Sequence, residues 1–322
     1  MKVIDEVSSC SGLKSLENAL VKRIEDIVYV DDFQVREVTG VSRIYPFKNN
    51  LYFSLKSTLY EIESGSSEIH PVFRSDGYDN LYRLTDFTYL CFKRVSRDVL
   101  KYVIIDQNHN VLWGVEGDRF AQVYSDRVLL SPRFIDTEFW LHDQHGKELF
   151  HHQLPKGFSF ADIKVMDDVL FIRSNKGVNE VQNLKGLDAN TGELIWEKEY
   201  RLSEFSVAYN LHQGMYYGLN DRDFQILNPV TGEFVANTSV DGMFPKGVSP
   251  EVPLQSIHEG KLWFVSGRGS DACFGCFDIE TQSLDFIQQQ PLEGDDIFDA
   301  PVFHQGKLYL RSKFENLLYI LE

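Results

Sequence analysis

The chain has 322 residues, of which 43% are hydrophobic and 13% aromatic, and it carries a formal net charge of −16. These values are typical of a folded globular protein, and no stretch is apolar for long enough to cross a bilayer. The net negative charge excludes nucleic acid as a ligand, because a protein neutralises phosphates with a basic surface. The same charge is typical either of a simply soluble protein or of one that binds a basic partner.

The first residues, MKVIDEVSSC, end in a small-small-Cys run that faintly resembles a lipoprotein cleavage site. Asp5 and Glu6 stand where an export signal would need its apolar segment, so we expect a cytoplasmic protein.

The four cysteines are few and mostly ungrouped. They are more in keeping with free thiols than with a disulfide framework.

Residues 1–25 are predicted to form an N-terminal segment with one short helix. In LKSLENALVKRIED, the residues Leu13, Leu16, Leu20 and Ile24 recur at helical spacing on one face. The apolar face of this helix would either cover the rest of the domain or bind a partner. It is the one helix that we expect.

The rest of the chain repeats a phrase in which a short polar turn precedes two or three large apolar residues. Successive copies lie roughly 40 to 45 residues apart, the period of a four-stranded propeller blade. The seven copies are KNNLYF (48–53), TDFTYL (85–90), SDRVLL (125–130), MDDVLF (166–171), HQGMYY (212–217), HEGKLWF (258–264) and HQGKLYL (304–310).

A second phrase falls between the copies of the first, as in KGLDANTGELIW from Lys185. It consists of an apolar strand, an Asp or Asn, a polar turn that usually contains Gly, and another apolar strand. The Asp or Asn can accept hydrogen bonds from its own turn while Gly supplies a positive φ, so the phrase predicts the outer hairpin of each blade. Six complete copies exist, and the seventh stops at NLLYILE, the end of the chain.

These patterns predict an all-β fold, a seven-bladed β-propeller of four-stranded antiparallel blades over residues 26–322. The last blade lacks its fourth strand. The segment 26–38 carries apolar residues from Ile27 to Val30 and at Phe33, Val35 and Val38. We expect it to pair with 317–321 and to close the ring, which removes an exposed sheet edge.

Together the two phrases resemble the repeats of quinoprotein-type β-propellers. This superfamily includes the pyrroloquinoline-quinone dehydrogenases and also a cofactor-free propeller lipoprotein of outer-membrane protein assembly, so the resemblance leaves function open. In the dehydrogenases most blades end the outer hairpin with Trp, and an adjacent Cys-Cys pair lies near the quinone. Here only Trp113 and Trp196 occupy that position, and no Cys-Cys dipeptide exists. We therefore expect a non-catalytic member without cofactor.

Other motifs do not favour a catalytic or metal site. Cys273 and Cys276, if they lie on one strand, point to opposite faces and cannot share a metal without a bulge. The four histidines His142, His145, His151 and His152 cluster around one hairpin, but the adjacent pair must diverge. The zinc-protease HExxH, P-loop and Gly-x-Ser-x-Gly patterns are absent. We expect no catalytic, cofactor-binding or metal-binding residue.

A partner-binding surface is predicted on the loops between blades, which are rich in acids, and on one long loop, 240–253, with a Phe-Pro step at its apex. A solvated rim is the alternative interpretation of these charges. The predicted contact residues are Asp76, Asp79, Glu116, Asp118, Asp241, Met243, Phe244, Glu293, Asp295, Asp296 and Asp299.

The functional hypothesis is a non-enzymatic cytoplasmic propeller that binds another protein through these loops. Its most specific form is a bacterial immunity protein that neutralises a basic toxin, since acidic inhibitors gain association rate by electrostatic steering. Two alternatives remain. One is an enzyme or small-molecule binder that uses the central funnel, and the other is a structural adaptor in a larger assembly.

Overall fold

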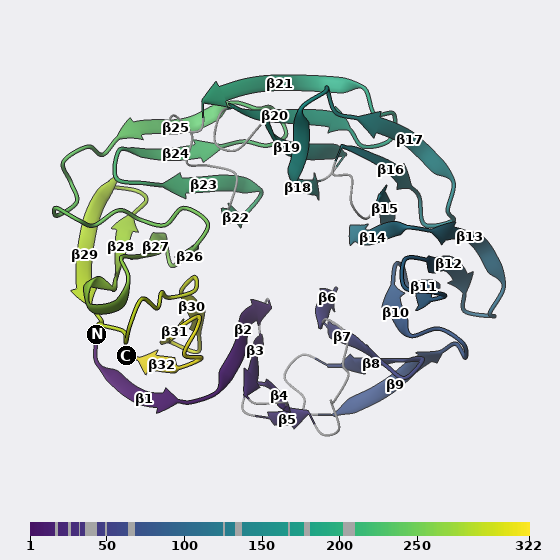
Figure 1. Ribbon diagram of the computed structural model, residues 1–322, viewed down its shortest axis with the longest axis horizontal. Helices are drawn as coiled ribbons and strands as arrows, with labels where there is room; N and C mark the ends of the chain where they lie inside the picture. The colour runs from purple at the N-terminus through teal and green to yellow at the C-terminus, as the bar shows by residue number, and fades with distance from the viewer. Residues whose placement is uncertain are drawn as a thin grey trace. The chain divides into compact units, whose positions relative to one another are not determined.

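The computed structural model describes residues 1–16, 19–24, 27–31, 33–35, 44–48, 50–63, 68–124, 126–132, 137–166, 168–176, 181–201 and 210–322. Across these residues the chain forms eight four-stranded antiparallel sheets (Figure 1). The described part contains no helix except a single 3-10 turn, Gly269–Asp271. The chain divides into two compact units, unit 1 (Met1–Glu37 with Ser203–Glu322) and unit 2 (Val38–Leu202).

Unit 2 contains four sheets, and in each the strands pair in chain order. Figure 1 shows that within this unit the first strand of each sheet lies on the inner side and the fourth on the outer side. The strands are β6 (Tyr45–Phe47), β7 (Asn50–Leu55), β8 (Thr58–Ile62), β9 (Ile69–Arg74), β10 (Asn80–Arg83), β11 (Thr88–Arg94), β12 (Leu100–Asp106), β13 (Val111–Gly117), β14 (Arg119–Tyr124), β15 (Arg127–Pro132), β16 (Glu138–His142), β17 (Glu148–Gln153), β18 (Phe158–Met166), β19 (Val169–Lys176), β20 (Val181–Asp188) and β21 (Leu194–Arg201).

Unit 1 also contains four sheets, with strand orders β2-β3-β4-β5, β22-β23-β24-β25, β26-β27-β28-β29 and β1-β32-β31-β30. The strands are β1 (Val3–Val7), β2 (Cys10–Leu16), β3 (Ala19–Ile24), β4 (Ile27–Val30), β5 (Phe33–Val35), β22 (Asn210–His212), β23 (Met215–Leu219), β24 (Asp223–Leu227), β25 (Phe234–Ser239), β26 (Gln255–His258), β27 (Lys261–Ser266), β28 (Cys273–Asp278), β29 (Ser283–Gln289), β30 (Val302–His304), β31 (Lys307–Arg311) and β32 (Leu318–Leu321).

The hydrophobic core lies between neighbouring sheets. The middle strands are buried over most of their length, as β7, β12 and β28 are, whereas the outer strands β13 and β25 alternate between exposed and half-buried residues. Within unit 2, Phe73 of one sheet stacks on Tyr89 of the next, with ring centroids 3.8 Å apart. A sheet that packs on both faces needs apolar residues at successive positions of its middle strands, which explains the short apolar runs in the repeat.

The outer hairpins have the predicted turn chemistry. Asp106, Asp143, Asp188, Asn228 and Asp278 each accept hydrogen bonds from backbone N–H groups two to four residues further along the turn. These side chains replace the backbone partners that a tight turn cannot provide. The prediction that the second phrase forms the outer hairpin is confirmed at these five positions.

Two of these hairpins also receive an aromatic ring from the preceding sheet. Gly146 has φ 82°, and a Cβ placed on it would lie 2.1 Å from atoms of Trp113. Gly192 has φ 76°, and its Cβ would lie 2.6 Å from the ring of Phe150. Glycine is required at both positions because the turn is left-handed and because a neighbouring side chain lies where a Cβ would be. The Trp or Phe that ends one hairpin packs on the Gly of the next.

The predicted N-terminal helix is wrong. β2 and β3 pair antiparallel, with Leu13 opposite Lys22. Cys10 and Leu20 are buried against Tyr309 and Leu318 of the neighbouring sheet. The leucines repeat at helical spacing, but a short apolar pattern of this kind is compatible with a helix and with a strand. Packing against the neighbouring sheet favours the strand here.

The predicted pairing of 26–38 with 317–321 is also wrong. β32 pairs instead with β1, in a register that places Val3 opposite Leu321 and Val7 opposite Leu318. The described part of 26–38 forms β4 and β5, while residues 26, 32 and 36–38 lie outside the described residues. The strands β2 to β5 therefore make a further sheet, so the described residues contain eight sheets where seven were expected.

Candidate functional site

Three loops of unit 1 form a continuous layer at one end of its sheets. We call residues 267–272, 290–301 and 312–317 the loop layer. Backbone hydrogen bonds join them: Gly269 N–H donates to Asp296 O at 2.9 Å, Leu292 N–H to Gly269 O at 2.9 Å, and Lys313 N–H to Ile297 O at 2.9 Å. Gly269 has no room for a Cβ, which would lie 2.1 Å from Gly294 O. The loops therefore hold one another in fixed positions.

Asp296, one of the predicted contact residues, lies inside this layer and is only 3% exposed. Its carboxylate accepts hydrogen bonds from the backbone N–H groups of Ile297 at 2.7 Å, Phe314 at 2.9 Å and Glu315 at 3.0 Å. Burial alone would raise the pKa of this carboxyl, but the backbone donors outweigh burial and hold the pKa below its ordinary value. Asp296 thus fixes the conformation of the loop 312–317.

Asp299 is also engaged within the protein. The guanidinium of Arg311 donates from Nε to Asp299 Oδ2 at 2.6 Å, and its Nη2 contacts the same oxygen. The same guanidinium donates to the carbonyl of Cys10 at 3.3 Å and to Asn316 Oδ1 at 3.1 Å. The charge of Asp299 is therefore balanced by a half-buried arginine.

The loop layer exposes more acidic than basic side chains, together with one aromatic side chain. Phe314 is 64% exposed, and its backbone N–H is one of the donors to Asp296. Among the charged residues of the layer, four acids and two bases are exposed: Asp271, Glu293, Asp295, Glu315, Arg268 and Lys313. Sequence reasoning missed Phe314, although an isolated aromatic residue in the polar turn RSKFEN was a usable signal.

The long loop 240–253 is divided between core and surface. Phe244 packs edge-on against Phe264, with ring centroids 5.7 Å apart, and belongs to the core between two sheets of unit 1. Met243 is 41% exposed, and Asp241 is exposed as well. Of the expected Phe-Pro anchor, the phenylalanine therefore contributes to folding, while the preceding methionine remains on the surface.

The other four predicted residues belong to unit 2. Asp76 pairs with Arg74 at 2.9 Å on the surface. Asp79 Oδ2 accepts a hydrogen bond from Arg94 N–H at 3.0 Å, which fixes the neighbouring turn. Glu116 and Asp118 are exposed, and Glu116 lies opposite Lys101 on the adjacent strand. Three of these four acids thus have a basic residue beside them.

The four cysteines are buried, whereas the histidines of the predicted cluster differ in exposure. Cys276 belongs to the core with Phe274, and burial raises the pKa of its thiol to about 12. His151 stacks on Trp140 at 4.7 Å. Burial, followed by the nearby Lys185 cation, lowers the pKa of His152 to about 4. Among the residues that the structure describes, no group of three His, Cys, Asp or Glu side chains is placed to hold a metal ion.

Comparison with known proteins gives structural matches only. No family model and no curated protein matches the sequence. The fold resembles BamB from Moraxella catarrhalis, with a TM-score of 0.53 and 11% identity over 100% of this chain and 97% of that one. It also resembles a europium-containing methanol dehydrogenase, with a TM-score of 0.51 and 10% identity over 96% and 84% of the two chains. A third match is an oligogalacturonate lyase in complex with manganese, with a TM-score of 0.50 and 13% identity over 81% and 86%.

These likenesses show that the chain has a quinoprotein-like β-propeller fold, which confirms the resemblance inferred from the repeats. At 10 to 13% identity, these matches indicate a shared fold and do not indicate a shared activity. In the described part of the chain, no helix has the length and hydrophobicity needed to cross a membrane.

Proposed function

We propose that the protein is a non-enzymatic propeller that binds a basic protein through the loop layer of unit 1. The observation that carries this proposal is Phe314, an aromatic side chain that is 64% exposed on a loop held rigid by the buried Asp296 carboxylate. Aromatic residues on preorganised loops supply much of the binding energy at protein interfaces, because little entropy is lost when they dock.

We infer the sign of the partner's charge from the exposed charged residues of the loop layer. Asp271, Glu293, Asp295 and Glu315 are exposed in the same layer, against Arg268 and Lys313, and the whole chain carries a charge of −16. A basic partner would be attracted before contact and oriented by this field. A bacterial immunity protein that neutralises a basic toxin in the cytoplasm is the most specific form of the proposal. An adaptor that joins a larger assembly would use the same surface.

The experiment is a quantitative capture of partners from the native organism with wild-type protein, with Phe314→Ala and with Phe87→Ala. Phe87 is a matched control, because it is 63% exposed but lies on the turn between β10 and β11 in unit 2. We expect one basic protein to be captured in stoichiometric amount by the wild type and by Phe87→Ala. With Phe314→Ala, its affinity should fall by at least about 30-fold, as for an aromatic hot spot.

A partner that Phe314→Ala retains and Phe87→Ala loses would place the interface elsewhere and contradict the proposal. Capture of several components of one assembly, all dependent on Phe314, would favour the adaptor over the immunity protein.

A further inference from the structure

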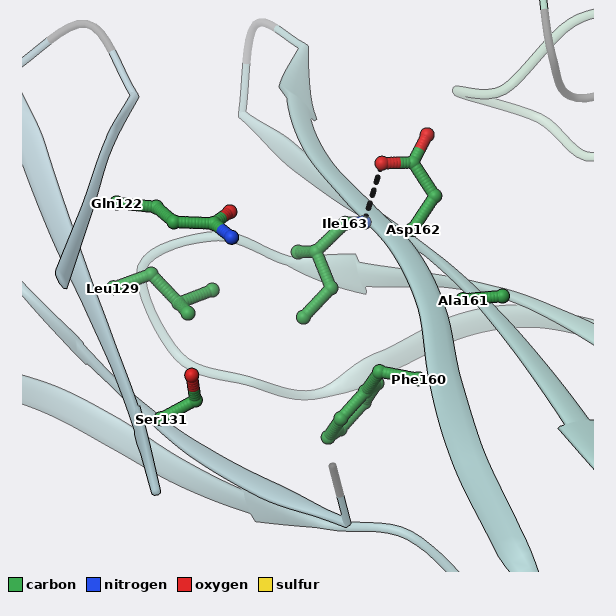
Figure 2. Close-up of a pocket in the computed structure, with 7 residues that line it drawn as sticks. All are labelled: Gln122, Leu129, Ser131, Phe160, Ala161, Asp162 and Ile163. Carbon is green, nitrogen blue, oxygen red and sulfur yellow. Dashed lines mark hydrogen bonds between the residues drawn. The ribbon is translucent and has the colours of Figure 1, made fainter. Parts of the chain in front are cut away.

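A pocket of about 200 Å³ lies between two sheets of unit 2, at their inner strands. Figure 2 shows its walls, with Gln122 of β14 and Leu129 and Ser131 of β15 on one side and the segment from Phe160 to Ile163 of β18 on the other. The volume equals that of about six or seven water molecules, at ~30 Å³ each. The pocket is therefore suited to a single small molecule.

A β-bulge in β18 shapes the second wall. Phe160 lies opposite Ser174 and Asp162 lies opposite Arg173, so Ala161 is an extra residue in the ladder. Phe160 and Ile163 consequently both face the pocket, which regular alternation would not allow. Asp162 lies on the open edge of β18, where its Oδ1 accepts a hydrogen bond from Ile163 N–H at 3.0 Å. Figure 2 shows that the second oxygen of this carboxylate points away from Gln122, Ser131 and Phe160.

The base of the pocket is apolar, whereas its rim has unused hydrogen-bonding groups. Leu129 and Ile163 are buried, and the Phe160 ring stands beside them. The Tyr124 hydroxyl donates to Ile163 O at 2.7 Å and also contacts Gln122 Oε1, while the amide nitrogen of Gln122 forms no hydrogen bond with any described residue. The Ser131 hydroxyl forms no hydrogen bond with any described residue, and neither does Asp162 Oδ2. One donor and one hydroxyl thus lie beside an apolar surface.

We propose that this pocket binds one neutral sugar ring or a polyol of similar size. Such a molecule has an apolar C–H face, which would pack on Phe160, Leu129 and Ile163. Its hydroxyl groups would meet Gln122 Nε2 and Ser131 Oγ. Asp162 is the one charged residue of the described lining, and Lys164 Nζ lies 3.7 Å from its Oδ1. Because the Lys164 cation offsets this charge, the pocket has no strong preference for a cationic or an anionic ligand.

The test is ligand-observed NMR and thermal-shift titration of the full chain with glucose, galactose and myo-inositol, alongside glucuronate and ethanolamine as charged probes. We expect at least one neutral probe to bind saturably and to raise the melting temperature. Gln122→Ala and Ser131→Ala should each weaken that binding by about five- to tenfold, since each removes one hydrogen bond. Phe160→Leu should weaken it while preserving an apolar pocket.

Gln107→Ala is the matched control, because Gln107 is an exposed glutamine in the turn between β12 and β13 of the same unit. It should bind the neutral probe with wild-type affinity. Preference for ethanolamine or for glucuronate would overturn the assignment to a neutral ligand. Absence of saturable binding by every neutral probe, or binding that Gln122→Ala and Ser131→Ala leave unchanged, would overturn the site itself. Because Phe314 belongs to unit 1, none of these outcomes bears on the proposed protein partner.

Discussion

At the scale of single residues, neighbouring acids have opposite roles that only tertiary contacts separate. Asp295 is exposed, whereas the next residue, Asp296, is 3% exposed and accepts three backbone hydrogen bonds. In Asp296→Asn the amide NH₂ would face some of these N–H donors, and the net charge that they stabilise would be lost. We expect the free energy of unfolding near neutral pH to fall by about 1–3 kcal/mol, and to change little in Asp295→Asn.

The pH dependence follows from the lowered pKa of Asp296. A carboxyl whose pKa is lower in the folded state contributes stability that is fully present above its unfolded pKa of about 4 and is lost as the pH falls through the folded pKa. The difference between wild type and Asp296→Asn should therefore shrink below about pH 4, as measured by urea unfolding across the acid range. A difference that stays constant through this range would contradict the assigned role.

The sequence did not distinguish Asp296 from Asp295, nor Phe314 from Phe244, because these distinctions depend on contacts with distant segments. Asp296 is engaged by residues about 18 positions away, at Phe314 and Glu315. Phe244 is covered by Phe264 of another strand, while nothing comparable covers Phe314. Composition identified an acidic loop region, and the structure identifies which of its side chains are available for binding.

At the scale of the elements, the outer hairpins were predictable because their signal is local. An Asp or Asn at a fixed place in the turn, with Gly a few residues later, determines the turn through hydrogen bonds within the same hairpin. The hairpin of β2 and β3 was not predictable, because its leucines are compatible with a helix until the neighbouring Tyr309 and Leu318 are present. The choice of β1 as the partner of β32 likewise depends on a pairing between the two ends of the chain.

Because Trp113 packs on Gly146, we expect a methyl group at position 146 to lower the free energy of unfolding. Both Gly146→Ala and Gly157→Ala place a side chain at positive φ, 82° and 91°, which costs about 1–2 kcal/mol. Nothing lies within 4 Å of a Cβ at Gly157, whereas at Gly146 the Trp113 side chain must move. We expect Gly146→Ala to lose about 1–3 kcal/mol more than Gly157→Ala in urea unfolding. Equal losses would mean that the ring does not hold the sheets together.

At the scale of the whole molecule, the repeat period and the two phrases were sufficient to predict a quinoprotein-like propeller, since seven of the eight described sheets contain the first phrase. The number of sheets was not predictable, because the segment from Cys10 to Val35 lacks both phrases and still forms four strands. The charge of −16 belongs to the whole chain, and the exposed residues of the loop layer contribute four acids and two bases to it.

The central claim, a basic partner at the loop layer, is tested most directly by the association rate of the captured partner as a function of ionic strength. The comparison is between wild type and the double variant Glu293→Gln, Asp295→Asn, which removes two exposed charges and leaves Asp296 and Asp299 intact. We expect the wild-type rate to fall steeply with added salt, and the double variant to associate several-fold more slowly with a flatter salt dependence. A rate that is indifferent both to salt and to the two substitutions would contradict the account.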